Sequence, residues 1–172
     1  MDTKIRILVV DDHLMVRRGI AQLLANAPEV EIVGEAENGE RALELCGKLL
    51  PDIVLMDLRM EGMGGLAATE AIHRSHPETR IIGLSTFAES HMVASMMASG
   101  ASAHLPKSVT YDELIDAVRK VVKGEVAMVQ GKSVKSDRGP NLSGSLTGQQ
   151  RRVLVLLAKG FTNAEIANYL GF

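Results

Sequence analysis

The sequence lacks several features that mark secreted, membrane-spanning or disulfide-stabilised proteins. Its 172 residues include no tryptophan, one cysteine and only 3% aromatic residues. A single cysteine excludes an internal disulfide framework, and no stretch reaches the roughly 18 consecutive apolar residues that a membrane span requires. The first residues run into an apolar segment without the pattern of a signal peptide. We therefore expect a cytoplasmic protein with no membrane partner.

The composition is nevertheless that of a globular chain, with 46% hydrophobic and 23% charged residues. With so few aromatics, the core must be built from aliphatic side chains and from the nine methionines. The single cysteine, Cys46, shares an apolar helical stripe with Ala42, Leu45 and Leu49. This spacing predicts a small buried side chain rather than a reactive thiol.

Charge is nearly balanced overall but unevenly distributed. The net charge is −2, yet residues 125–172 hold six Lys and Arg against three Asp and Glu, while residues 1–124 hold 13 against 18. An acidic front and a mildly basic tail indicate different partners for the two parts.

Residues 1–124 alternate apolar strands with amphipathic helices five times. The run 53–57 places four apolar residues before Asp57 without polar alternation, which is typical of a strand buried on both faces of a parallel sheet. Strands are expected at about 5–10, 30–35, 53–57, 80–84 and 102–105, and helices at about 14–26, 39–47, 66–75, 88–99 and 110–123. Asn38 can cap the second helix. The apolar faces expected in the core are those of the first helix, with Val16, Ile20, Leu23 and Leu24, and of the last helix, with Leu114, Val118, Val121 and Val122. Short connections and right-handed crossovers predict an α/β fold, a five-stranded doubly wound parallel sheet of flavodoxin-like order 2-1-3-4-5.

Three carboxylates follow two of these strands directly. Asp11 and Asp12 follow the first strand, and Asp57 ends the third. In the order 2-1-3-4-5 the tips of these strands meet at the switch point of the sheet, where ligands bind. Any one of these acids could instead serve capping or turn chemistry. Three converging acids repel one another unless a proton or cation neutralises them, which predicts a bound divalent metal, and all-oxygen ligands suit Mg²⁺.

Other polar groups are expected at the same edge. Ser85 and Thr86 follow the fourth strand, and Lys107 follows the fifth. A carboxylate can attack a phosphoryl group to give an acyl phosphate, while a metal ion and an ammonium group stabilise the charge on the transferred oxygens. His13 is the only candidate general base by proximity to the acids.

Four stretches carry a resemblance to a known family. Leu8 to His13, Met56 to Met60, Leu84 to Phe87 and Leu105 to Lys107 resemble the motifs of two-component response regulator receivers, in order and spacing, over residues 4–123. Residues 146–171 resemble the opening of the LuxR-type helix-turn-helix of the NarL/FixJ class. The resemblance implies three parts: a receiver domain at 1–124, a flexible linker at 125–145, and a short all-α appendage at 146–172.

The receiver resemblance assigns a role to each residue at the strand tips. It implies that Asp57 accepts a phosphoryl group from a sensor histidine kinase. The implied Mg²⁺ ligands are Asp12 directly, Asp11 through water, Asp57, and Arg59 by its backbone carbonyl. Ser85 matches the switch hydroxyl that follows the phosphoryl group, Thr86 occupies the next position, and Lys107 matches the family's lysine.

Three positions depart from the family pattern. Glu61 stands where proline is usual and Gly64 where aspartate is frequent, so we expect a looser loop after Asp57. His104 occupies the position of a Tyr or Phe that turns inward on activation. A histidine there is either a tolerated substitution or a switch residue that responds weakly or with pH. Nearby, the predicted helix 88–99 carries Met92, Val93, Met96 and Met97, which either pack in the core or form an interface with a second copy or with the tail.

The tail is expected to form the first two helices of a DNA-binding unit, truncated before its recognition helix. Thr147 with Gln150, and Thr162 with Glu165, form capping boxes that start these helices. Arg151, Arg152 and Lys159 are candidates for weak contacts with DNA phosphates. Base readout requires the next helix, so DNA is a partner only if that helix is present in the full-length protein.

Together these patterns predict a transcription regulator switched by Mg²⁺-dependent phosphoryl transfer to Asp57. The expected partners are a sensor histidine kinase, DNA, and a second copy of the phosphorylated chain. The alternative is a receiver that acts through protein contacts only. An Asp-nucleophile phosphatase is disfavoured, because Arg59 holds the place of its second acid. We therefore expect no enzyme beyond self-phosphorylation and slow dephosphorylation.

Overall fold

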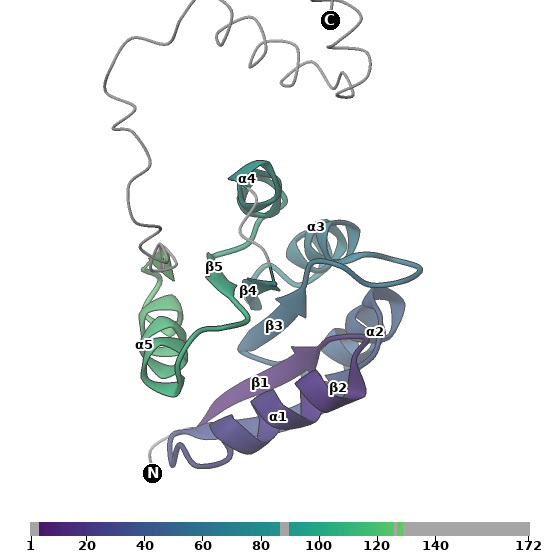
Figure 1. Ribbon diagram of the computed structural model, residues 1–172. Coiled ribbons are helices and arrows are strands. Elements are labelled where there is room, and N and C mark those ends of the chain that lie inside the picture. Colours follow the sequence, from purple (N-terminus) through teal and green to yellow (C-terminus); the bar gives the residue numbers. More distant parts are fainter. Residues whose placement is uncertain (1–3, 87–89, 126, 129–172) are drawn as a thin grey trace, which may run out of the picture. The chain divides into compact units, whose positions relative to one another are not determined.

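The computed structural model describes residues 4–86, 90–125 and 127–128, in which strands and helices alternate (Figure 1). The strands are β1 (Ile5–Val10), β2 (Val30–Ala36), β3 (Ile53–Asp57), β4 (Arg80–Ser85), β5 (Ala103–Pro106) and β6 (Ala127–Met128). The helices are α1 (Leu14–Leu24), α2 (Gly39–Leu49), α3 (Gly65–Ser75), α4 (Ser90–Ala98) and α5 (Tyr111–Val122). No helix in these ranges is long and apolar enough to cross a membrane.

All paired strands run parallel in the order β2-β1-β3-β4-β5-β6. The predicted fold class and the order 2-1-3-4-5 of the first five strands are therefore confirmed. The sixth strand was not predicted, because it spans two residues of a segment expected to be a linker. It pairs with Ala103 and His104 and so covers the first half of the edge that β5 would otherwise expose.

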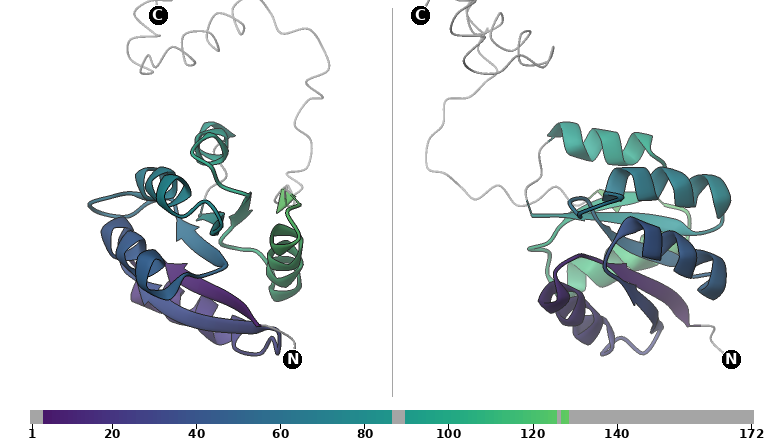
Figure 2. Two further views of the ribbon diagram at one scale, coloured as in Figure 1. Left: turned by 180° about the vertical axis from the view of Figure 1, so that it is seen from behind. Right: turned by 90° about the vertical axis from the view of Figure 1, so that its right-hand side faces the viewer.

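The sheet is covered by helices on both faces, with α1 and α5 on one and α2, α3 and α4 on the other (Figures 1 and 2). Side chains along each strand alternate between the two layers. In β1, for example, Ile7 and Val9 pack with α1 and α5, while Leu8 and Val10 pack with the opposite helices. This double burial explains why the strands are continuously apolar.

The methionines of α4 belong to the core. Met96 is fully buried, and the partly buried Met92 and Met97 pack against the same cluster. The structure therefore favours core packing over an interface for these side chains. Cys46 of α2 is also fully buried, as predicted, and burial raises the pKa of its thiol to about 12.

Helix boundaries and faces differ from the predictions at a few positions. Helix α2 continues to Leu49 rather than ending near Gly47, because Leu50 takes the left-handed conformation that closes the helix. Leu23 and Val122 were expected in the core but are 45% and 43% exposed. Each lies next to a buried residue, and one step along a helix turns a side chain by about 100° away from the apolar face.

Two helix starts are fixed by side-chain caps. The predicted cap of α2 is confirmed, since the Asn38 side chain accepts a hydrogen bond from the backbone N–H of Arg41 at 2.8 Å. Helix α5 begins with a capping box between Thr110 and Glu113 that the sequence analysis missed. The predicted helices at 146–172, with Arg151, Arg152 and Lys159, lie outside the described residues and stay predictions.

Gly65 is a position beside the site where the fold tolerates no side chain. A Cβ there would lie 2.1 Å from the Asp57 carbonyl oxygen and 2.8 Å from the Leu58 Cα, both backbone atoms.

We expect Gly65→Ala to lower the free energy of unfolding by about 2 kcal/mol or more, because backbone must move. The matched control is Gly19→Ala within α1, where nothing lies within 4 Å. It should raise stability by up to about 1 kcal/mol. Urea unfolding measures both, and equal effects would contradict the argument.

Candidate functional site

The predicted acids converge at the carboxyl edge of the sheet. Asp11 directly follows β1, Asp57 ends β3, and Val10 pairs with Met56, so the two acids stand at the same level of neighbouring strands. Asp11 is 0% and Asp57 3% exposed. With Asp12 and His13 they offer ligand atoms that all lie within 4.8 Å of one another. The convergence predicted from the strand ends is therefore present.

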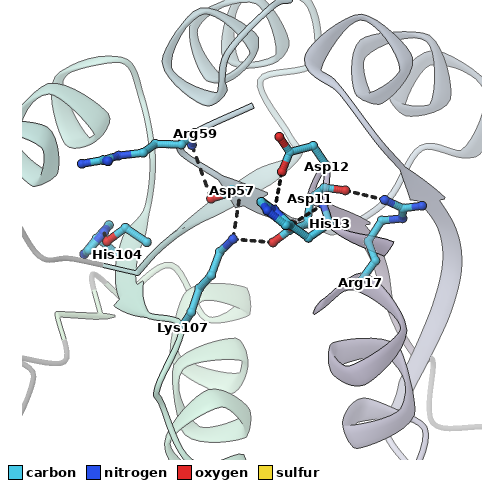
Figure 3. Close-up of polar contacts among 9 residues, drawn as sticks. Asp11, Asp12, His13, Arg17, Asp57, Arg59, His104 and Lys107 are labelled. Atoms are coloured by element: carbon cyan, nitrogen blue, oxygen red, sulfur yellow. Dashed lines mark hydrogen bonds and ion pairs between the residues drawn. The ribbon is translucent and has the colours of Figure 1, made fainter. Parts of the chain in front are cut away.

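Lys107 bridges the two buried acids (Figure 3). Its Nζ lies 2.6 Å from Asp11 Oδ2 and 3.0 Å from Asp57 Oδ2. Burial alone would lower the pKa of Lys107, but its hydrogen bonds with Asp11 and Asp57 outweigh burial and raise the pKa. The lysine is therefore a fixed positive charge beside both carboxylates.

The surroundings of Asp57 disfavour the charged form of its carboxyl group. Burial raises its pKa; Lys107 and the Arg59 backbone N–H, 3.3 Å from Asp57 Oδ1, oppose this increase, while the neighbouring Asp11 adds to it. Three carboxylates beside one ammonium group leave two negative charges uncompensated. A divalent cation with oxygen ligands fits this donor set and this excess charge. The residues present therefore fit Mg²⁺.

Two groups that the sequence analysis missed hold the loops around the acids. The Arg17 guanidinium donates to the Asp11 carbonyl oxygen at 2.5 Å (Figure 3). It also lies 3.4 Å from Glu35 near the end of β2. In the loop after β3, Met63 N–H donates to Glu40 Oε1 at 3.0 Å, and Met63 carbonyl accepts from Gly39 N–H at 3.1 Å. The loop expected to be loose is thus attached to the start of α2. The only sign of these contacts in the sequence is the opposite charge of Arg17 and Glu35, which lie in consecutive predicted elements.

The predicted switch residues also meet. Ser85 and His104 are 6% and 4% exposed, and Ser85 Oγ lies 2.9 Å from His104 Nε2. Burial lowers the pKa of His104. Thr86, by contrast, is exposed. His13 lies beside the acids, with Nδ1 2.7 Å from Asp12 Oδ1, and its side chain is 71% exposed.

Fold and site define a receiver: a doubly wound sheet with buried acids and a lysine at its carboxyl edge. Residues 7–119 match the response regulator receiver domain. The chain is 40% identical over 173 residues to the transcriptional regulatory protein LiaR of Bacillus subtilis, covering 96% of this chain and 82% of that protein. It is 36% identical over 168 residues to the response regulator VraR of Staphylococcus aureus, covering 95% and 80%.

A solved structure gives the same result. The receiver domain of the putative response regulator NarL from Mycobacterium tuberculosis superposes with a TM-score of 0.69 at 36% identity, covering 72% of this chain and 99% of that one. The chain therefore belongs to the two-component response regulator family. Of these relatives, LiaR is named as a transcriptional regulatory protein, in agreement with the class predicted from the sequence.

The raised pKa of Asp57 predicts a cost to folding that a neutral side chain removes. A carboxyl whose folded pKa lies above its unfolded pKa contributes stability below the unfolded pKa, and that contribution is lost as the pH rises through the folded pKa. At pH 7.5 without Mg²⁺, Asp57→Asn should therefore raise the free energy of unfolding by roughly 1 kcal/mol.

The control for this substitution is Asp116→Asn, at an exposed acid paired with Lys120, which should change stability by less than about 0.5 kcal/mol. Added Mg²⁺ should stabilise the wild type and not Asp57→Asn. Urea unfolding with and without Mg²⁺ measures both effects. An Asp57→Asn protein no more stable than the wild type would contradict the inference that the surroundings of this carboxyl group disfavour its charged form.

Proposed function

We propose that this response regulator accepts a phosphoryl group on Asp57 from a sensor histidine kinase, in a Mg²⁺-dependent step that switches a DNA-binding output. The observation that carries the proposal is the contact of one lysine with two buried acids, at 2.6 Å to Asp11 and 3.0 Å to Asp57. This arrangement places a nucleophilic carboxylate beside a positive charge that can bind phosphoryl oxygens.

In the proposed step an Asp57 carboxylate oxygen forms a bond to phosphorus as the bond from phosphorus to the donor histidine nitrogen breaks. The electron pair of that bond stays on the leaving imidazole, which takes up a proton. Asp12, Asp11 through water, Asp57 and the Arg59 carbonyl would hold Mg²⁺. When bound, the ion neutralises charge on the transferred oxygens. Lys107 then binds an oxygen of the new phosphoryl group, and Ser85, or the exposed Thr86, donates to another.

The chain is proposed to act as a phosphoacceptor and not as a turnover enzyme. Rapid hydrolysis of the acyl phosphate requires a general base aimed at an attacking water. His13 lies against Asp12 and is largely solvent-exposed, and Arg59 stands where aspartate-based phosphatases place a second acid. Self-phosphorylation followed by slow dephosphorylation fits this set of residues.

The DNA-binding output is supported by the relatives and by the tail composition. LiaR, which the chain matches over 96% of its length, is a transcriptional regulatory protein. Residues 125–172 carry six Lys and Arg against three Asp and Glu. We propose that Arg151, Arg152 and Lys159 contact DNA phosphates once the recognition helix is supplied, and that phosphorylation promotes a homodimer. The alternative is a receiver that acts only through protein contacts.

Incubation with a small phosphodonor and Mg²⁺ tests the phosphoacceptor assignment. Intact mass should show one added phosphate on the wild type and none on Asp57→Ala, because the nucleophile is gone. Asp116→Ala is the control, since this acid is exposed on α5 and pairs with Lys120. Lys107→Ala should reduce the labelling rate at least tenfold by removing charge stabilisation worth about 1.4 kcal/mol or more. An adduct that survives Asp57→Ala would disprove the site.

A gel shift tests the proposed output. A chain extended past Phe172 to include the recognition helix should bind DNA more tightly when phosphorylated, and the binding should weaken steeply with salt because phosphate contacts release counterions. Asp57→Ala should abolish the effect of phosphodonor and leave basal binding unchanged. Absence of binding by the phosphorylated extended chain would favour the protein-contact alternative.

A further inference from the structure

The hydrogen bond between Ser85 and His104 joins two strands at the edge of the site. Ser85 ends β4, and Gly83 precedes it by two residues in the same strand. His104 lies in β5 and pairs with Gly83. Alternate residues of a strand share a face, so both side chains project toward the α2, α3 and α4 layer. The two groups are 6% and 4% exposed, and Oγ and Nε2 lie 2.9 Å apart. Each buried polar group thus has the other as a partner.

The direction of this bond determines what Ser85 can offer to a phosphoryl group. A serine hydroxyl has one proton, and a neutral imidazole has one donor and one acceptor nitrogen. Burial lowers the pKa of His104, so its ring is neutral at neutral pH. An imidazole nitrogen is a stronger base than a hydroxyl oxygen, so the favoured pairing is Ser85 donating to Nε2.

Phosphoryl oxygens on Asp57 only accept hydrogen bonds. We propose that His104 is a positioning residue that holds the Ser85 proton in the unphosphorylated protein, so that Ser85 must leave His104 before it can bind the phosphoryl group. This inference rests on the proposed phosphorylation of Asp57. In this proposal the bond from Ser85 to His104 opposes the movement of Ser85 toward the phosphoryl group. A Phe at position 104 would supply no such opposing contact.

The opposing contact is weaker than the one that replaces it. A hydrogen bond between neutral groups contributes only a modest net free energy. Its loss or gain changes a binding constant about fivefold. A bond from Ser85 to a charged phosphoryl oxygen is roughly twice as strong as a neutral one. Phosphorylation can therefore displace Ser85 from His104. Because the bond to His104 must first break, the apparent affinity of the site for the phosphoryl group is lower than it would be without the histidine.

The test measures the affinity for beryllofluoride, a phosphoryl analogue, in the presence of Mg²⁺. His104→Leu removes the acceptor at similar volume and should bind beryllofluoride about fivefold more tightly than the wild type. His104→Gln is the matched control, because its amide oxygen can still accept from Ser85 and should keep the wild-type affinity. A His104→Leu affinity equal to or weaker than that of the wild type would overturn the proposal.

A double-mutant cycle isolates the hydroxyl. In a Ser85→Ala background, His104→Leu should leave the beryllofluoride affinity unchanged, because no proton remains to be released. A gain that persists without Ser85 would mean that His104 acts by another route. Nitrogen NMR of the wild-type imidazole adds a measurement independent of any variant. Nε2 should be unprotonated before beryllofluoride is added, and a protonated Nε2 would refute the proposed direction of the bond.

These measurements separate the two proposals. If the wild type and Asp57→Asn bind beryllofluoride equally, the proposed function fails. If binding depends on Asp57 but His104→Leu brings no gain, only the role of His104 fails. Should His104→Leu not fold, as judged by urea unfolding, the NMR measurement on the wild type still decides the direction of the bond.

Discussion

The carboxyl edge of this protein depends on one ammonium group shared by two buried carboxylates. Asp11 and Asp57 end neighbouring strands and are almost completely withdrawn from solvent, so their charges repel each other with little screening by water. Lys107 reaches them from β5, past the tip of β4, and contacts both. These two contacts tie together the ends of three strands. The ammonium group of Lys107 balances only part of the charge, and a divalent cation would neutralise the remainder.

The loops around this charge cluster are held by groups that do not belong to it. Arg17 fixes the carbonyl of Asp11, and Glu40 with Gly39 holds the loop after β3 at Met63. Gly65 allows the start of α3 to lie directly against the Asp57 carbonyl. These contacts restrain the backbone from several sides before any ligand arrives, so binding requires little reorganisation of the chain. Charge and rigidity therefore have separate structural sources.

Residue patterns predicted much of this arrangement, and the reasons for success and failure are physical. Continuous apolar runs such as 53–56 identify strands buried on both faces, and the residue after such a run must lie at the carboxyl edge, which located Asp11, Asp57 and Lys107. Periodicity carries no information on how far a side chain reaches, so the Arg17, Glu40 and Ser85–His104 contacts were not predicted. The strand β6 was missed because two residues are too few for a period. Leu23 and Val122 were misplaced because one step around a helix separates core from surface.

The burial of Cys46 has a practical consequence for following this protein in solution. Its side chain, on α2, is wholly buried in the core, and burial raises the pKa of the thiol to about 12, so almost none is thiolate at neutral pH. Alkylating probes react with thiolates and need access to the sulfur, and this side chain offers neither. A cysteine introduced on an exposed position would therefore be the single reactive attachment point. Spin labels or fluorophores can be placed on α4 or α5 without first removing the native residue.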